Sequence, residues 1–284
     1  MDCQRFVLVD VFTDTPLQGN QLGVFTDAGA LSGEQMQRLA RELNFSESVF
    51  VLAPERGGDA RIRIFTPSAE LSFAGHPVLG AAIALGGEPA RASLTLETGL
   101  GAIAVALRSE RGRPAFARMR QPAPTWAPYE REAQLLDALG VSRSSLPVEA
   151  YRNGPLQVYV ALEHERQLAA LRPDMRALGE LGELCASCFA GDPRGRLGTR
   201  VFAPGLGVPE DPATGSAAGP LAVHLARHGL IEFGREIQIR QGEQMGRPSL
   251  LYALAEGSRA PEHVREVQVG GFAVIVARGE FTLG

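Results

Sequence analysis

The chain has 284 residues, of which 45% are hydrophobic and 21% charged, and its net charge at pH 7 is -4. This balance is ordinary for a globular protein large enough for two domains, and it does not favour nucleic acid as a partner. All 28 basic residues are arginine. Without lysine the chain cannot be a pyridoxal phosphate enzyme, a lysine-dependent aldolase or a Walker A nucleotide-binding protein.

The N-terminal apolar run covers only residues 5–9 and ends at Asp10. It is too short to span a membrane, and no basic region with a cleavage site marks it as a signal peptide. We therefore expect a cytoplasmic protein with no membrane partner.

The first half of the chain predicts short strands around two helices. Strands are expected at residues 6–12, 23–25, 49–52 and 60–65, and a helix at residues 31–43, with Ser32 or Gly33 near its start. Thr98-Gly99-Leu100-Gly101 lies between two apolar runs and predicts a hairpin. The same letters spell G-x-G-x-x-A, but a dinucleotide site needs a helix after the glycines, and residues 102–107 have the composition of a strand.

Residues 122–128 contain three prolines and form the best candidate for a linker. We therefore expect an N-terminal half at residues 1–121 and a C-terminal half at residues 129–284; the sequence leaves open whether the final strand completes the first half. The second half predicts helices at residues 130–139, 165–171 and 175–184. Strands are expected at residues 158–162, around Arg200, and at residues 237–240, 250–255, 264–269 and 272–276.

One motif occurs in both halves. Arg63-Ile-Phe-Thr-Pro67 leads to Gly75 and an apolar run at residues 78–85, and Arg200-Val-Phe-Ala-Pro204 leads to Gly215 and an apolar run at residues 217–225. A helix that is apolar on most faces is usually buried, so each half is expected to wrap a sheet around one central helix. A helix start opened by glycine offers backbone N–H groups to an anion.

Three side chains could transfer protons without a cofactor or metal. Glu47 lies in a turn before a strand, where a carboxylate is usually solvated. His76 follows Gly75 at a helix start, which favours the neutral ring, although a lone histidine is more often structural. Asp211 precedes Gly215 in a segment three residues longer than its counterpart, where capping of the helix by Asp211 or Thr214 is the simpler explanation. In one cleft the three would form an acid–base set.

Other pairs of reactive side chains are better explained by structure. His224 and His228 have the i, i+4 spacing of a metal pair, but no glutamate follows the first, and packing is the preferred explanation. Cys185 and Cys188 have C-x-x-C spacing without a second pair, so we expect buried side chains rather than a redox or zinc site.

Three segments resemble the signatures of the PhzF-like isomerase family. These are Asn44-Phe-Ser46-Glu47-Ser48, Phe73-Ala-Gly75-His76-Pro77 and Glu210-Asp211-Pro-Ala-Thr-Gly-Ser216, and the resemblance extends over essentially the whole chain. Tyr151-Arg-Asn-Gly-Pro155 and Gly246-Arg-Pro-Ser-Leu250 point more narrowly to the member that acts in phenazine biosynthesis.

The resemblance implies an α+β, diaminopimelate epimerase-like fold with two pseudo-symmetric halves, an active site between them and a homodimeric assembly. It implies catalytic roles for Glu47, His76 and Asp211 and no metal or cofactor. The family's substrate-binding positions correspond to Ser46, Gly75, Gly215 and Ser216, and Asn20 is added from the supporting segment Leu17-Gln-Gly-Asn20.

The implied reaction is an allylic isomerisation of trans-2,3-dihydro-3-hydroxyanthranilate, a small carboxylate, to its keto isomer. Glu47 would remove a proton from C3 and return it at C1, while His76 and Asp211 would hydrogen-bond the substrate. An isomerase or epimerase of another small carboxylate is the nearest alternative, and a non-catalytic binding protein on the same fold is the second. A two-cysteine epimerase is disfavoured because no cysteine stands beside Gly75 or Gly215.

Overall fold

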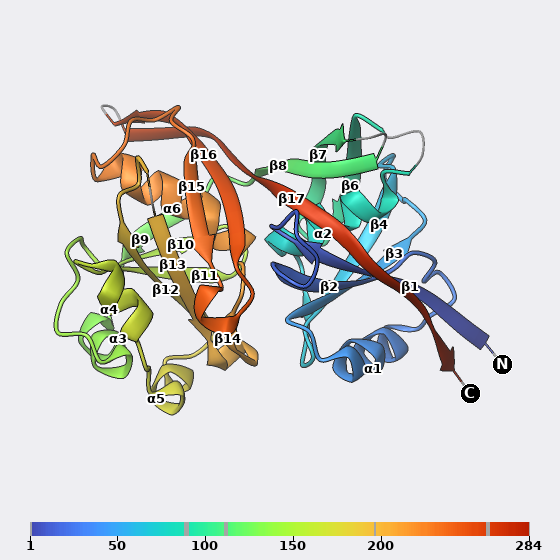
Figure 1. Cartoon of the computed structure of the whole chain (residues 1–284), viewed down its shortest axis with the longest axis horizontal. Coiled ribbons are helices and arrows are strands. Elements are labelled where there is room, and N and C mark those ends of the chain that lie inside the picture. The colour runs from blue at the N-terminus through green and yellow to red at the C-terminus, as the bar shows by residue number, and fades with distance from the viewer. Residues whose placement is uncertain (1, 88–90, 111–112, 196, 260–261, 284) are drawn as a thin grey trace. The chain divides into compact units, whose positions relative to one another are not determined.

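A computed structural model describes residues 2–87, 91–110, 113–195, 197–259 and 262–283 (Figure 1). The chain divides into two compact units. The first unit contains residues 1–120 together with 270–284, and the second unit contains residues 121–269. Among the described residues, no helix is both long and apolar enough to cross a membrane.

In the first unit the strands form a closed ring. β1 pairs with β17 and β2, β2 with β3, β3 with β4, β4 with β6, β6 with β7, β7 with β8, and β8 with β17. The short strand β5 pairs with β4 at one edge. The elements are β1 (Asp2–Val11), β2 (Asn20–Phe25), α1 (Gly33–Leu43), β3 (Glu47–Leu52), β4 (Ala60–Phe65), β5 (Glu70–Leu71), α2 (Gly75–Leu85), β6 (Ser93–Thr98), β7 (Gly101–Glu110), β8 (Arg113–Gln121) and β17 (Glu262–Leu283).

Helix α2 lies inside this barrel and contacts β1, β2, β3, β6 and β7 (Figure 1). Every residue from Gly75 to Ile83 is buried, as expected for a helix without a polar face. Its packing is close: a Cβ added to Gly80 would lie 2.5 Å from a methyl group of Leu22. The apolar run after Gly75 therefore forms the centre of the first unit.

The second unit wraps a mixed sheet around helix α6. Strands follow the order β9, β10, β11, β12, β13, β15, β16, β17, and the short strand β14 pairs with β13. Helix α6 is buried from Gly215 to Ala226. The elements are β9 (Thr125–Pro128), α3 (Glu132–Leu139), β10 (Glu149–Arg152), β11 (Leu156–Ala161), α4 (Glu165–Ala170), α5 (Met175–Glu180), β12 (Leu184–Gly191), β13 (Leu197–Ala203), β14 (Val208–Asp211), α6 (Gly215–Arg227), β15 (Ile237–Gln241) and β16 (Ser249–Arg259), with 3-10 turns at Pro204–Leu206 and Glu243–Met245.

The two units share one topology. The parallel pairs β2–β3 and β4–β6 of the first unit correspond to β11–β12 and β13–β15 of the second. In each unit a short strand follows the arginine motif and precedes the central helix. The internal repeat in the sequence is thus a repeat of structure.

Several predicted elements are confirmed and others were wrong. Helix α1 begins after Ser32, whose hydroxyl accepts from the backbone of Gln35, and the hairpin at Gly99-Leu100 joins β6 to β7. Sequence reasoning missed β8, β9, β10 and β12, and it continued helix α5 to residue 184 although that helix ends at Glu180. The residues proposed as a linker, 122–128, contain β9, which pairs with β10.

The strands predicted at residues 264–269 and 272–276 are one strand, β17, which has 22 residues. Gly270 and Gly271 look like a break in the sequence, but the backbone continues through them. A Cβ on Gly270 would lie 2.9 Å from the carbonyl oxygen of Ala117, so glycine is needed there for close approach rather than for a turn. Residues 273–283 of this strand pair with β1.

Candidate active site

Glu47 and His76 lie together in the first unit. Glu47 is the first residue of β3, opposite Leu22 of β2, and not in a turn as the sequence suggested. Its side chain is 15% exposed, and that of His76, the second residue of α2, is 3% exposed. His76 Nε2 lies 3.6 Å from Glu47 Oε2, slightly beyond hydrogen-bond range. A carboxylate and an imidazole therefore meet in a nearly dry environment.

The imidazole of His76 is neutral near pH 7. Burial lowers the pKa of His76 to about 3, because the charged ring would lose its hydration in the barrel interior. A neutral imidazole carries one proton and one lone pair, so it can donate at one nitrogen while it accepts at the other.

Two other predicted site residues, Ser46 and Asn20, form a hydrogen-bonded chain that leads to His76. Ser46 Oγ donates to Asn20 Oδ1 over 3.0 Å, and Asn20 Nδ2 lies 3.3 Å from His76 Nδ1. Asn20 is buried at the start of β2. The structure thus connects Ser46, Asn20, His76 and Glu47 within one unit.

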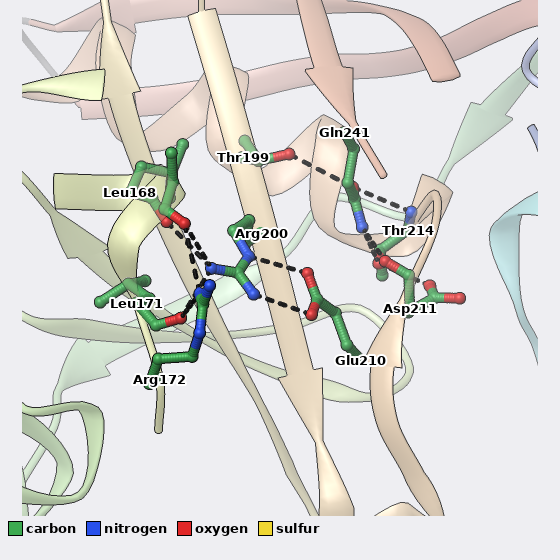
Figure 2. A network of polar contacts seen from close by, with 10 residues as sticks. Leu168, Leu171, Arg172, Thr199, Arg200, Glu210, Asp211, Thr214 and Gln241 are labelled. Carbon is green, nitrogen blue, oxygen red and sulfur yellow. Dashed lines mark hydrogen bonds and ion pairs between the residues drawn. The ribbon is translucent and has the colours of Figure 1, made fainter. Parts of the chain in front are cut away.

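Asp211 ends β14 in the second unit and belongs to a separate polar network (Figure 2). Its Oδ2 accepts a 2.6 Å hydrogen bond from Thr214 Oγ1. Gln241 Nε2 donates to Thr214 Oγ1 over 2.9 Å and to the backbone carbonyl of Asp211 over 2.7 Å. Because Gln241 donates to the Thr214 hydroxyl, the proton of that hydroxyl is directed to Asp211. Capping by Thr214, one of the two simpler explanations, does not occur: Thr214 is the cap residue, but its side chain makes no capping bond.

A buried ion pair holds the strand on which Asp211 lies (Figure 2). Arg200 donates from Nε and Nη2 to the two carboxylate oxygens of Glu210, over 2.8 and 2.9 Å. Its Nη1 donates to the backbone carbonyls of Leu168 and Leu171 over 3.1 and 2.9 Å. The arginine of the second motif therefore fixes β14 one residue before Asp211.

The predicted substrate-binding positions at the helix starts differ in their surroundings. Neither the cap residue of α2 nor that of α6 supplies a side-chain capping bond, which suits helix starts that present backbone N–H groups. Ser216 is buried, and its hydroxyl accepts a 3.3 Å bond from Gln157 Nε2. The carbonyl of Gly215 accepts a 2.8 Å bond from Gln121 Nε2.

Sequence reasoning missed the three glutamines that support these positions. Gln121, Gln157 and Gln241 are all buried and hydrogen-bonded, although glutamine usually lies at the surface. Each lies at least 27 residues from the side chain or backbone group it contacts near the α6 start. A polar residue inside an apolar strand pattern, as Gln157 is before Val158, was the one available signal.

A cluster of Glu149, His224 and His228 has the composition and spacing of a metal site. However, Arg227 Nη1 lies 2.7 Å from Glu149 Oε2 and supplies a positive charge there. Burial raises the pKa of Glu149, but hydrogen bonds from His224, His228 and Arg227 outweigh it and hold that pKa well below its usual range. The cluster is therefore explained as a charge-balanced link between β10 and α6. Cys185 and Cys188 are likewise buried on β12, as expected, and neither forms a disulfide.

The model of the phenazine biosynthesis-like protein family matches residues 9–279. The chain belongs to this family. It is 54% identical to the trans-2,3-dihydro-3-hydroxyanthranilate isomerase of Pseudomonas aeruginosa over 97% of this chain and 98% of that protein. The isomerase of the same name from Pseudomonas fluorescens is 53% identical over 98% of this chain and 99% of its own.

Solved structures confirm the expected fold. A phenazine biosynthesis protein of the PhzF family from Bacillus anthracis covers all of both chains with a TM-score of 0.86 and 27% identity. A probable proline racemase from Agrobacterium radiobacter, 14% identical, covers 99% of this chain and 93% of its own with a TM-score of 0.67, which shows likeness of fold alone. This family member thus has the α+β, diaminopimelate epimerase-like architecture of two related halves.

Proposed function

We propose that this chain is an isomerase that converts trans-2,3-dihydro-3-hydroxyanthranilate to its keto isomer in phenazine biosynthesis, without a cofactor. The observation that carries the proposal is the 54% identity, over nearly the full length of both chains, to a protein named for that reaction. The acid–base pair of Glu47 and His76 in the first unit supplies chemistry that fits it.

Glu47 is the proton-transferring group of the proposal. Its carboxylate takes the proton from C3 of the substrate and returns it at C1, so the double bonds shift and the resulting enol becomes a ketone. Limited exposure of the side chain keeps water away from the carboxylate and favours return of the proton to the substrate. Proton transfer by a positioned side chain contributes on the order of 10²–10⁴-fold.

His76 and Asp211 support the transfer by hydrogen bonding. The neutral ring of His76 stabilises negative charge as a donor without delivering a full positive charge. Asp211 accepts hydrogen bonds from the substrate amine or hydroxyl, and Thr214 holds its carboxylate in place. Backbone N–H groups at the starts of α2 and α6, with Ser216, bind the substrate carboxylate in a chain that has no lysine.

The proposal also includes a homodimer and a cytoplasmic location, as the sequence led us to expect. A small carboxylate is the only partner it requires besides the second copy of the chain.

Replacement of Glu47 tests the reaction and the residue together. Wild type is expected to remove the diene absorbance of trans-2,3-dihydro-3-hydroxyanthranilate, and Glu47→Gln to reduce kcat by at least about 10²-fold, because an amide cannot take up the proton. Glu42→Gln is the matched control, since Glu42 is exposed on α1 of the same unit.

The outcomes separate the alternatives. Absence of turnover in wild type would exclude this substrate, and turnover of another small carboxylate would then identify a related isomerase or epimerase. Full activity of Glu47→Gln would reject the assigned base. Tight binding of the substrate without turnover by wild type would indicate a binding protein.

A further inference from the structure

Asn20 contacts His76 on the side of the ring opposite to Glu47. Its amide nitrogen lies 3.3 Å from His76 Nδ1, whereas Glu47 lies 3.6 Å from His76 Nε2. The side chain of Asn20 is buried with 1% exposure, so this contact is shielded from water. The sequence had suggested that Asn20 and Ser46 bind substrate, but here both have partners inside the first unit.

The amide of Asn20 lies with its oxygen toward Ser46 and its NH₂ group toward the histidine. Ser46 Oγ donates to Asn20 Oδ1 over 3.0 Å, which leaves the NH₂ group toward His76 Nδ1. An amide NH₂ group can only donate, so Nδ1 must be the acceptor and cannot carry the ring proton.

The carboxylate of Glu47 independently selects the same form of the ring. An ionised carboxylate has only lone pairs, so it is stabilised by an N–H group on the facing nitrogen and repelled by a second lone pair. With the proton on Nε2, each side of the ring offers the group that its neighbour requires. Both neighbours thus select one tautomer.

We propose that Asn20, oriented by Ser46, is a positioning residue that fixes His76 as the Nε2–H tautomer, so that the ring presents a proton toward Glu47. Only the kinetic consequence of this inference rests on the proposed function. The opposite tautomer would present a lone pair to the same carboxylate and would give neither Glu47 nor an enolate a donor.

Ring nitrogen shifts in NMR spectra of ¹⁵N-histidine-labelled protein test the tautomer directly, with His76→Gln to assign the signals. At pH 7 the wild type is expected to show a protonated Nε2 and an unprotonated Nδ1. In Asn20→Asp the new carboxylate accepts from Nδ1, so Nδ1 should become protonated. Asn153→Asp, at another buried amide, is the matched control and should leave the His76 signals unchanged.

Two NMR results would overturn the proposal: a wild-type ring protonated at Nδ1, or an unchanged His76 pattern in folded Asn20→Asp. If Asn20→Asp does not fold, Ser46→Ala takes its place, and there a mixture of tautomers is expected in place of one. None of these measurements requires turnover, so a wrong substrate assignment leaves the test intact.

The division of the kinetic effect between kcat and KM tests the role in catalysis. If Asn20 acts through His76, Asn20→Ala should lower kcat roughly 10- to 100-fold, the range found for partners that orient a metal-bound histidine, with KM nearly unchanged. A raised KM with unchanged kcat would instead make Asn20 a substrate contact and reject the positioning role.

Discussion

Both units contain the same arginine motif, but we expect its ion pair to stabilise the second unit more than the first. Arg63 of β4 makes a two-pronged ion pair with Glu70 of β5, with both distances 2.7 Å, and Arg200 of β13 does the same with Glu210 of β14. Each guanidinium also lies about 5 Å from the ring of the phenylalanine two residues later, at 5.1 Å in the first unit and 4.9 Å in the second.

Burial distinguishes the two pairs. The side chain of Arg63 is 25% exposed, whereas that of Arg200 is 5% exposed and also donates to backbone carbonyls near α4. Only in the second unit does the clamped glutamate precede a predicted catalytic residue, Asp211. A repeated motif can therefore keep its geometry while one copy becomes part of the support for a site.

The largest expected difference between the units comes from removing the two arginines. Arg200→Met leaves the Glu210 carboxylate and several carbonyls without their partner in a buried place, and should lower the free energy of unfolding by about 3–5 kcal/mol. Arg63→Met removes a partly exposed pair and should cost about 1 kcal/mol or less. Urea unfolding of both variants measures the contrast, and equal losses would refute it.

A smaller difference is expected from the glycines inside the central helices. A Cβ at Gly219 of α6 would lie 2.2 Å from Gln121 Oε1, a side chain that is held by its bond to Gly215, whereas at Gly80 of α2 it would meet a methyl group of Leu22. Overpacking of this kind costs about 1–3 kcal/mol. Gly219→Ala should lose stability at the upper end of this range and Gly80→Ala at the lower end. Thermal unfolding of both variants measures the order. The reverse order would show that the Gln121 side chain moves aside more easily than the Leu22 methyl group.

The smallest effect concerns the residue after the opening glycine, which is His76 in the first unit and Ser216 in the second. The pKa of His76 is about 3 in the folded chain, against an ordinary value of 6.5. Between these values the unfolded chain binds a proton that the folded chain does not. Stability from the neutral ring is therefore complete above pH 6.5 and is lost as pH falls toward 3.

His76→Ser makes the first helix start resemble the second and removes this titration. Between pH 6.5 and 4.5 the unfolding free energy of wild type should fall relative to that of His76→Ser by on the order of 1–2 kcal/mol, given a limit of about 1.4 kcal/mol per pH unit. Denaturant curves at a series of pH values measure it. A difference that stays constant across that range would mean that His76 is protonated in the folded state.

The sequence was informative where local pattern determines structure. Runs of small apolar residues predicted both central helices, and Gly99-Leu100 predicted a hairpin, because burial and turn geometry depend on neighbouring residues. The family resemblance indicated Glu47 and His76, which the fold places 3.6 Å apart.

Long-range polar contacts could not be predicted in this way. Asn20 reaches His76 from 56 positions away, and Gln241 reaches the Thr214 hydroxyl from 27, because strands bring them to the helix starts. Thr214 is a residue type typical of a helix cap, yet its hydroxyl accepts from the distant Gln241 and donates to Asp211 instead of capping the helix. Local propensity is overridden where a buried network offers a stronger acceptor.

Strand β17 has a consequence for how the chain is made. Residues 273–283 pair with β1, so the barrel of the first unit joins Asp2 to Leu283, residues that are far apart in the sequence. During synthesis the first strand leaves the ribosome long before its neighbour exists, and the loop that must close contains the whole second unit. We expect the second unit to be able to assemble first, while the barrel that carries Glu47 and His76 cannot close until β17 has been translated.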